Sequence, residues 1–384
     1  MREPETLGLK TSVIVLGAGV SGLSVALVLL QRGHQVTLLE RSTVGNESSW
    51  AGGGILSPLL PWDYAEPVSA LALRSMAAYA DWVAGIEATS RMDAEFWRCG
   101  MLALKVTAPE RALAWCAAHG MAAERGFPSL PSSSRAPETS SAPQEISSDS
   151  VWLPDIAQVR NPRLVAAMRA AVVQLGGVIR EHCPATGVLT QGGRVAAVQA
   201  TTGPFYADSV VLATGAWAGL GLAGLAATPH IRPVRGQILL FKLESGALDT
   251  ILYRNGLYLI PRRDGHVLVG STLEDAGFDK STDTPARKTL HAAAAELLPV
   301  LGSMQPIQHW AGLRPGSPDN IPIIDRHPDF RNVFVNTGHY RYGVTMAPAS
   351  AELLVDLMED RTPALDPTPY SWNAASMRTW TGTV

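Results

Sequence analysis

The sequence predicts an α/β fold in which a Rossmann-like nucleotide-binding part, discontinuous in the chain, is joined to an α+β part with a large, mostly antiparallel sheet. Three observations lead to this prediction. A buried strand, a Gly-rich turn, a helix and a second strand follow one another from Val13 to Glu40. Another buried strand with a small-residue turn, Asp208–Trp217, comes much later in the chain. Between His230 and Ser271, alternating polar and apolar residues and the turn signal Asp264-Gly265 predict antiparallel strands.

The turn after the first strand, GAGVSG, has the G-x-G-x-x-G pattern of a dinucleotide-binding, Rossmann-like unit. Gly17 permits the tight turn, Gly19 lets a pyrophosphate approach the backbone, and Gly22 lets the helix pack closely on the strand. The phosphates would lie at the helix N-terminus, where amide groups are unpaired. Glu40, at the end of the second strand, is placed to accept from ribose hydroxyls, and it would repel a 2′-phosphate that Arg41 might otherwise bind. NAD or FAD is therefore favoured over NADP.

Bulk composition narrows the class of protein. The chain has 384 residues, of which 46% are hydrophobic and 17% charged, as expected of a soluble enzyme with a large core. The net charge of −3 gives no broad basic surface for nucleic acid or an anionic membrane. Only three cysteines occur, Cys99, Cys116 and Cys183, without metal-ligand spacing, which favours a reduced, cytoplasmic protein. We find no signal peptide, and the apolar stretch Leu23–Leu30 is too short to span a bilayer.

A second Gly-rich loop, residues 41–55, follows Glu40. Ordering so many glycines costs conformational entropy. The functional interpretation is a loop wrapped against phosphate or a flat ring, with the Ser48 and Ser49 hydroxyls as donors. The alternative is a flexible surface loop, but the apolar pair Ile55-Leu56 directly after it favours order. Because a nicotinamide enzyme does not need this loop, it indicates a cofactor that extends deep into the protein.

The remaining chain alternates between the two sheets. The turn Ala213-Thr214-Gly215 ends either a plain core strand or a strand that returns to the first sheet beside the cofactor. Periodicity predicts helices over 67–90, 161–176, 284–301 and 347–358, a strand pair over 96–106 and a hairpin around Gly203. The predicted domains are a discontinuous nucleotide-binding domain (10–75, 151–228 and 312–370), a substrate domain (76–127 and 229–311) and a Pro/Ser-rich mobile insert (128–150), for which an active-site lid is the alternative.

Two late loops carry the candidate substrate residues, Trp310–Gly316 and Thr337–Gly343. Arg314 has a planar guanidinium that can bind a carboxylate through two parallel hydrogen bonds. Tyr258 can donate to the same carboxylate, although tyrosine in a sheet also packs, and Arg341 can hold a substrate oxygen or the loop itself. His339 is interpreted as a local hydrogen-bonding residue. The dipole of the helix beginning near Ala347 would stabilise negative charge on a reduced cofactor.

Taken together, GAGVSG with Glu40, ESSWAGGGILSPLLPW, LATGAWAG, VRGQ, YLIPRRDGHVLVGSTLEDAGFDK, AGLRPGSPDNIPIID and GHYRYGV resemble the D-amino-acid oxidase family of flavin-dependent amine oxidases. The resemblance covers nearly the whole chain except the insert. It implies non-covalent FAD, since no cysteine follows Cys183 to carry a covalent flavin. It also implies the substrate residues Arg314, Tyr258 and Arg341. Tyr342 departs from the family pattern, because close relatives often carry Asn at this position of the flavin-contacting loop.

The motifs and the resemblance together give one set of expected FAD contacts. These are Gly17, Gly19, Val20, Ser21, Gly22, Glu40, Arg41, Ser48, Ser49, Gly53, Gly54, Ile55, Ala185, Thr214, Gly215, Trp217, Gly312, His339, Tyr340, Arg341, Tyr342, Gly343, Val344 and Thr345.

The activity that the resemblance implies is oxidative deamination of glycine, sarcosine or small D-amino acids by dioxygen, in thiamine thiazole synthesis. The products would be glyoxylate or another 2-oxo acid, ammonia and hydrogen peroxide. Rival interpretations are a dehydrogenase that passes electrons to a quinone, an oxidase of a modified tRNA base, and a non-catalytic flavin-binding partner. The acidic balance disfavours the tRNA enzyme. Family members are often homo-oligomers, tetramers among them, but no interface signature is seen here.

Overall fold

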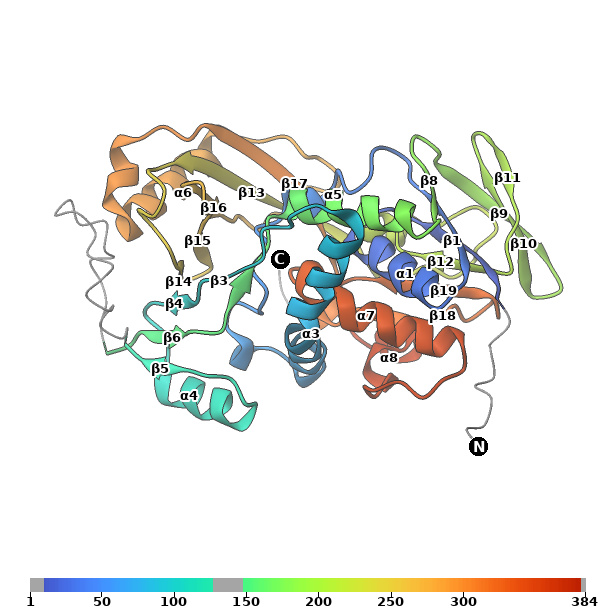
Figure 1. Cartoon of the computed structure of the whole chain (residues 1–384), viewed down its shortest axis with the longest axis horizontal. Helices are drawn as coiled ribbons and strands as arrows, with labels where there is room; N and C mark the ends of the chain where they lie inside the picture. The colour runs from blue at the N-terminus through green and yellow to red at the C-terminus, as the bar shows by residue number, and fades with distance from the viewer. Residues whose placement is uncertain (1–9, 127–147, 381–384) are drawn as a thin grey trace.

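The computed structural model describes residues 10–126 and 148–380. Two large sheets lie side by side, one carrying the N-terminal strand and the other the long strands β13 and β17 (Figure 1). The predicted α/β fold class is confirmed. The predicted insert, 128–150, lies outside the described residues except for its last three positions.

The first sheet has six strands, all parallel to their neighbours except β18, which runs antiparallel to β19. Its order reverses at β1, which lies between β2 and β12, so the carboxyl ends of these strands form a topological switch point. The six strands, in spatial order, are β18 (Ile323–Arg326), β19 (Val333–Thr337), β12 (Ser209–Leu212), β1 (Ser12–Leu16), β2 (Gln35–Leu39) and β8 (Val178–Arg180).

Both faces of this sheet are buried, which explains the continuous apolar runs of its strands. Val13 and Val15 of β1 pack into a core with the helices, whereas Ile14 and Leu16 pack with a small three-stranded sheet on the opposite face. The helices are α1 (Val20–Gln31), α3 (Glu66–Ser90), α5 (Asn161–Gln174) and α7 (Gly343–Met358), and the small sheet consists of β9 (Ala185–Gln191), β10 (Arg194–Ala200) and β11 (Gly203–Phe205).

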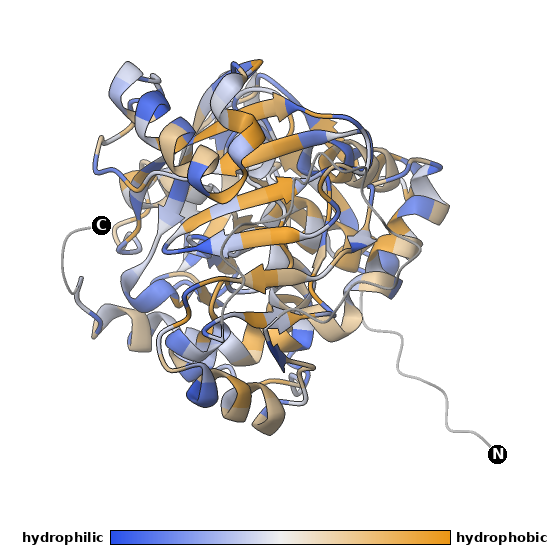
Figure 2. Ribbon diagram, turned by 90° about the vertical axis from the view of Figure 1, so that its left-hand side faces the viewer, coloured by the Kyte–Doolittle hydropathy of each residue, from blue (hydrophilic) through white to orange (hydrophobic). Residues whose placement is uncertain are grey.

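The second sheet has eight strands and is antiparallel except where β14 pairs with β4. Its strands are predominantly hydrophobic (Figure 2), and α6 (Thr284–Leu297) covers one face through Leu290, Ala294 and Leu297. In spatial order the strands are β17 (Gln308–Gly316), β13 (Arg232–Lys242), β16 (His266–Gly270), β15 (Leu257–Pro261), β14 (Ile251–Arg254), β4 (Met101–Ala103), β6 (Val151–Leu153) and β5 (Glu124–Arg125).

Several short elements complete the fold. Strands β3 (Trp97–Arg98) and β7 (Ala157–Gln158) form a two-stranded sheet. The short α-helices are α2 (Ser48–Ala51), α4 (Pro109–Ala118) and α8 (Trp372–Ser376). The 3-10 helices are η1 (Pro61–Asp63), η2 (Gly215–Leu220), η3 (Pro299–Ser303), η4 (Pro318–Asn320) and η5 (Thr368–Tyr370).

The structure corrects three local predictions. The strands predicted over 96–106 do not pair with each other, because β3 pairs with β7 and β4 joins the large sheet. The segment 310–316 is not a loop but the end of β17, paired with β13 despite its glycines and proline. The last helix begins at Gly343, not near Ala347. The proposed domain boundaries at 75/76 and 311/312 fall inside α3 and β17, and the two-domain division stays a prediction.

Helix α7 contains Pro348, which explains why the sequence pattern placed its start too late. Proline has no N–H, so the carbonyl of Val344, one turn earlier, loses its usual donor. The Tyr79 hydroxyl of α3 donates to this carbonyl instead, at 3.0 Å. The next amide, that of Ala349, donates to Ser75 Oγ on α3 at 3.1 Å. Two α3 side chains therefore compensate for the disturbed turn.

We predict that Tyr79→Phe lowers the free energy of unfolding by about 1–2 kcal/mol, because the partly buried Val344 carbonyl loses the donor that replaces its helical partner, while the ring still packs. The Tyr79 side chain is only 1% exposed, so water cannot replace the hydroxyl. Urea denaturation measures the change. Tyr206→Phe, at a tyrosine that is 72% exposed, is the control and should change stability by less than about 0.5 kcal/mol. Equal stability of both variants would contradict this account of the helix.

Candidate functional site

A continuous cavity lies at the carboxyl ends of β1, β2, β12 and β19 and extends to the second sheet. It is lined by every candidate residue named from the sequence except Gly22. A Cβ at Gly22 would lie 2.0 Å from the Gly17 carbonyl oxygen, so this glycine serves the close packing of α1 on the turn. The structure thus brings together residues from distant parts of the chain, as expected for a ligand at a topological switch point.

The fingerprint turn forms one end of the cavity. Gly17 has a φ of 97°, and a Cβ there would lie 2.4 Å from the Ala213 carbonyl oxygen of the neighbouring strand segment. Helix α1 begins after Gly19 with no capping side chain of its own. Ser49 Oγ accepts instead from the Val20 amide at 2.9 Å. Its hydroxyl proton remains free to donate to a phosphate, as do the other first-turn amides.

Glu40 is fixed beneath this turn. Its two carboxylate oxygens accept from the amides of Ala18 and Ser42, each at 2.9 Å, and the remaining lone pairs are available to ribose hydroxyls. The neighbouring Arg41 turns away from it. The Arg41 guanidinium pairs with Glu47 at 2.7 Å and lies 3.5 Å above the Trp217 ring.

The turn Gly52–Gly54 forms the wall between the two sheets. A Cβ at Gly53 would lie 2.5 Å from Ile260 Cδ1 and 3.4 Å from the Tyr258 ring. Gly54 has a φ of 77°, which favours glycine. Asn161 donates to the Ser49 carbonyl at 2.9 Å, yet its buried Oδ1 has no hydrogen-bond partner among the described residues. Because Asn161 lines the cavity, this oxygen is suited to a hydroxyl-bearing ligand such as the ribityl chain of FAD.

Arg314 lies at the other end of the cavity, on β17. Its guanidinium donates to the carbonyls of Arg235 and Thr272 at 3.3 and 3.2 Å and to Ser271 Oγ at 2.5 Å. A Cβ at Gly236, on the paired strand, would lie 2.2 Å from this guanidinium, so only glycine leaves room for it. Within 10–126 and 148–380, no acidic side chain forms an ion pair with Arg314. The cation is therefore held by neutral groups and open to a carboxylate.

Tyr258 and Arg341 lie beside Arg314. Burial lowers the pKa of Arg314, the Tyr258 hydroxyl opposes that effect and the positive charge of Arg341 adds to it. Burial also lowers the pKa of Arg341, but the hydroxyls around it, led by Tyr342 and Tyr64, outweigh this effect and leave it raised. The Tyr342 hydroxyl donates to that of Tyr64, and the two rings meet edge to face at 5.0 Å. This end of the cavity is therefore cationic and rich in phenol groups.

His339 and the start of α7 close the cavity on the third side. The His339 ring is 1% exposed, and its Nε2 lies 3.0 Å from Ser350 Oγ on α7. Burial lowers the pKa of His339 from 6.5 to about 4, so the imidazole is neutral at physiological pH. Thr345 donates its hydroxyl to the Ile55 carbonyl at 3.0 Å. These contacts fix the helix N-terminus against the cavity and support the interpretation of His339 as a hydrogen-bonding residue.

Sequence reasoning missed four contributors. Ser271 orients Arg314, Gly236 makes room for it, Asn161 faces the Gly54 turn, and Tyr64 contacts Tyr342. Ser271 and Gly236 lie within the quoted motifs GST and VRGQ, so their neighbourhoods carried a signal. Asn161 and Tyr64 lie in segments with no motif, and only the tertiary structure reveals them.

The described residues offer neither a metal-ligand cluster nor a membrane-spanning helix. Within 10–126 and 148–380, no three His, Cys, Asp or Glu side chains are grouped so that they could hold a metal ion. In the same residues, no helix is both long and apolar enough to cross a membrane.

Comparisons with known proteins show the family and the fold of the chain. The family model "FAD dependent oxidoreductase" matches residues 12–357. A glycine oxidase of Pseudomonas aeruginosa is 42% identical over 360 residues, which are 94% of this chain and 98% of that protein. The bifunctional protein ThiO/ThiG of Synechocystis is 33% identical over 91% of this chain and 52% of its own length. The crystal structure of glycine oxidase from Geobacillus kaustophilus superposes with a TM-score of 0.85 at 27% identity, covering 94% and 98% of the two chains.

The lowered pKa of His339 predicts a pH effect on stability. The unfolded imidazole titrates near 6.5 and the folded one near 4, so the folded protein binds fewer protons between these values. Stability from the neutral ring is complete above 6.5 and is lost as the pH falls toward 4. Between about pH 7.5 and 5, the wild-type free energy of unfolding should fall by about 2 kcal/mol more than that of His339→Gln. Denaturation curves at both pH values measure this difference, and parallel losses in the two proteins would refute it.

Proposed function

The chain belongs to the family of FAD-dependent oxidoreductases, and from this premise we propose that it oxidises glycine and other small amines, with FAD as the electron acceptor and dioxygen as the oxidant. The observation that carries this proposal is the Arg314 guanidinium. It is held by carbonyl and hydroxyl oxygens, faces the cavity without a protein carboxylate among the described residues, and lies beside Tyr258.

The residues of the cavity fit FAD along its whole length. The α1 N-terminus and Ser49 suit the pyrophosphate, Glu40 suits the ribose, and the unpartnered Asn161 Oδ1 suits a hydroxyl of the ribityl chain. The N-terminus of α7 lines the same cavity and presents the positive end of its dipole there. When bound, FAD supplies the hydride acceptor and passes electrons to dioxygen.

The protein's own contribution is mainly binding and orientation. Arg314 binds the substrate carboxylate through a planar fork, and the Tyr258 hydroxyl is placed to donate to the same group. This fixes the α-carbon relative to the cofactor and converts the reaction to a unimolecular step. The neutral amine loses a hydride from its α-carbon to the flavin, which leaves an iminium; the iminium adds water and splits to the 2-oxo acid and ammonium. His339 takes no part as a base, because its Nε2 is engaged with the Ser350 hydroxyl inside the protein and burial lowers its pKa to about 4.

The wider setting is also proposed. The motif resemblance places glycine oxidation in thiamine thiazole synthesis, and the protein of Synechocystis named ThiO/ThiG supports a link to that pathway. A cytoplasmic location and a homo-oligomer stay predictions.

The proposal is tested with purified protein. We expect a yellow flavoprotein that releases hydrogen peroxide under air with glycine, sarcosine or D-alanine. Peroxide separates an oxidase from a dehydrogenase that needs a quinone. A protein that binds FAD but reduces it with none of these amines would overturn the glycine oxidase assignment, while leaving the cofactor assignment intact.

Arg314→Met should lower kcat/KM for glycine by about 100- to 1,000-fold, because two charge-assisted hydrogen bonds to the carboxylate are lost. The kcat/KM of Arg314→Lys should lie between the values of Arg314→Met and wild type, because an ammonium cannot reproduce the planar fork. Steady-state peroxide assays measure both, and the visible flavin spectrum should be unchanged. Arg331→Met, at an exposed arginine before β19, is the matched control. Wild-type kinetics in Arg314→Met would exclude Arg314 as the carboxylate ligand.

A further inference from the structure

A second arginine, Arg262, is buried directly behind the cavity wall. It follows Pro261 at the end of β15, the strand that carries Tyr258, and it is 4% exposed. Its guanidinium donates to the Gly53 carbonyl at 2.8 Å, to the Val159 carbonyl at 2.9 Å and to the Gln158 side chain. These acceptors come from the cofactor loop and from the segment before α5, so one side chain joins three separate parts of the chain.

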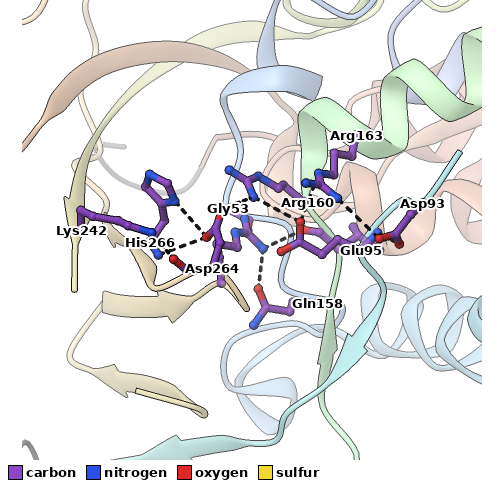
Figure 3. Close-up of polar contacts among 11 residues, drawn as sticks. Gly53, Asp93, Glu95, Gln158, Arg160, Arg163, Lys242, Asp264 and His266 are labelled. Carbon is purple, nitrogen blue, oxygen red and sulfur yellow. Dashed lines mark hydrogen bonds and ion pairs between the residues drawn. The ribbon is translucent and has the colours of Figure 1, made fainter. Parts of the chain in front are cut away.

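All contacts of Arg262 that the structure shows are to neutral oxygens. The nearby carboxylates are bound to other arginines: Glu95 pairs with Arg160 and Arg163, each at 3.2 Å, and Asp264 pairs with Arg160 at 2.8 Å (Figure 3). Burial lowers the pKa of Arg262 to about 10, which still leaves the group protonated at neutral pH. A buried positive charge therefore remains next to Gly53 without a contacting counter-charge in the described part of the chain.

The Arg262 charge can affect the cavity because the Gly53 peptide that it contacts forms part of the cavity wall. Gly53 lines the cavity, and its Cα lies so close to β15 that a Cβ would meet Ile260 at 2.5 Å and the Tyr258 ring at 3.4 Å. The Gly53 peptide thus stands between the Arg262 guanidinium and the part of the cavity that Tyr258 borders. Any movement of this turn would change the space between the cofactor and the substrate-binding tyrosine.

We propose that Arg262 is a positioning residue with an electrostatic role: it fixes the Gly53 turn against Tyr258, and its charge raises the reduction potential of the bound FAD. A cation in a low-dielectric environment stabilises the more negative of two redox forms. The inference rests on FAD binding but not on glycine as the substrate. It extends the site beyond the residues that line the cavity.

The competing explanation is that Arg262 only stabilises the structure by joining three segments through hydrogen bonds. If Arg262 only joined three segments, its replacement would lower stability and FAD affinity, but the potential of FAD that still binds would not change with the charge at this position. The reduction potential therefore separates the two roles.

The experiment uses FAD-loaded wild-type protein, Arg262→Met, Arg262→Lys and Arg263→Met. Arg263 is the matched control, since it is the adjacent arginine, is exposed, and among the described residues has its polar contact with the Phe96 carbonyl at 2.9 Å and its ring contact with Trp97 at 5.9 Å. Three quantities are measured without amine substrate: the FAD dissociation constant by fluorescence titration, the two-electron potential by dye equilibration, and thermal unfolding.

We expect Arg262→Met to weaken the binding of reduced FAD relative to oxidised FAD about tenfold, which for a two-electron couple is a fall of about 30 mV. Arg262→Lys should recover most of the potential near pH 7, yet bind FAD more weakly than wild type, because one ammonium cannot satisfy three fixed acceptors. Arg263→Met should match wild type in both quantities.

The pH dependence of the reduction potential of Arg262→Lys tests the role of the charge even if Arg262→Met does not fold. A buried lysine loses its proton at lower pH than a buried arginine. The potential of Arg262→Lys should therefore fall more steeply than that of wild type as the pH rises from about 7 to 9. Parallel pH profiles, or an Arg262→Met protein that binds FAD with the wild-type potential, would overturn the electrostatic role. Loss of amine oxidation with the predicted potential shifts intact would count against the proposed substrate alone.

Discussion

The close approach of the Gly53 peptide to Tyr258 and Ile260 is the constraint on which the rest of the site depends. A cavity that begins at one sheet and ends at another needs a chain segment that passes between them without filling the space. Glycine meets this requirement, because a Cβ at Gly53 would lie 2.5 Å from Ile260 Cδ1 and would force that buried side chain to move. Strand β15 and the residue after it therefore carry three linked functions: Tyr258 faces the substrate end, Ile260 packs on the turn, and Arg262 holds the Gly53 carbonyl.

Charge is distributed along the cavity to match the ligand proposed for it. At the fingerprint end, Glu40 is held by two backbone amides and leaves oxygens for ribose hydroxyls. At the opposite end, Arg314 and Arg341 make no ion pair with the described acidic residues, and neutral carbonyls and phenols surround them. Such groups orient a guanidinium without neutralising it, so the full charge remains available to an anionic substrate.

The sequence predicted well those parts of the structure whose conformation is determined by residues close together in the chain. The apolar run, the glycines and Glu40 lie within a short stretch, and their spacing alone determines the strand–turn–helix–strand unit. The sequence predicts a loop at the end of β17 because Gly312, Pro315 and Gly316 interrupt the pattern, yet pairing with β13 keeps this segment extended. The orientation of Arg314 depends on Ser271 and Gly236, which come from other strands, and no local pattern reports such a contact. The resemblance identified the residue, but only the tertiary structure explains how it is held.

Helix α7 shows why a reaction with little acid–base chemistry still demands a well-ordered protein. The field of a helix end falls off within its first turn, so the start of α7 can act on the cofactor only if it is held at a fixed distance. Three side-chain hydrogen bonds supply that restraint: Tyr79 to the Val344 carbonyl, Thr345 to the Ile55 carbonyl, and His339 with Ser350. Each joins α7 to a different segment, and the Thr345 bond reaches the same loop that Arg262 fixes from behind. The dipole and the guanidinium thus act from two sides of one rigid wall, because the residues that hold the wall also place the charges.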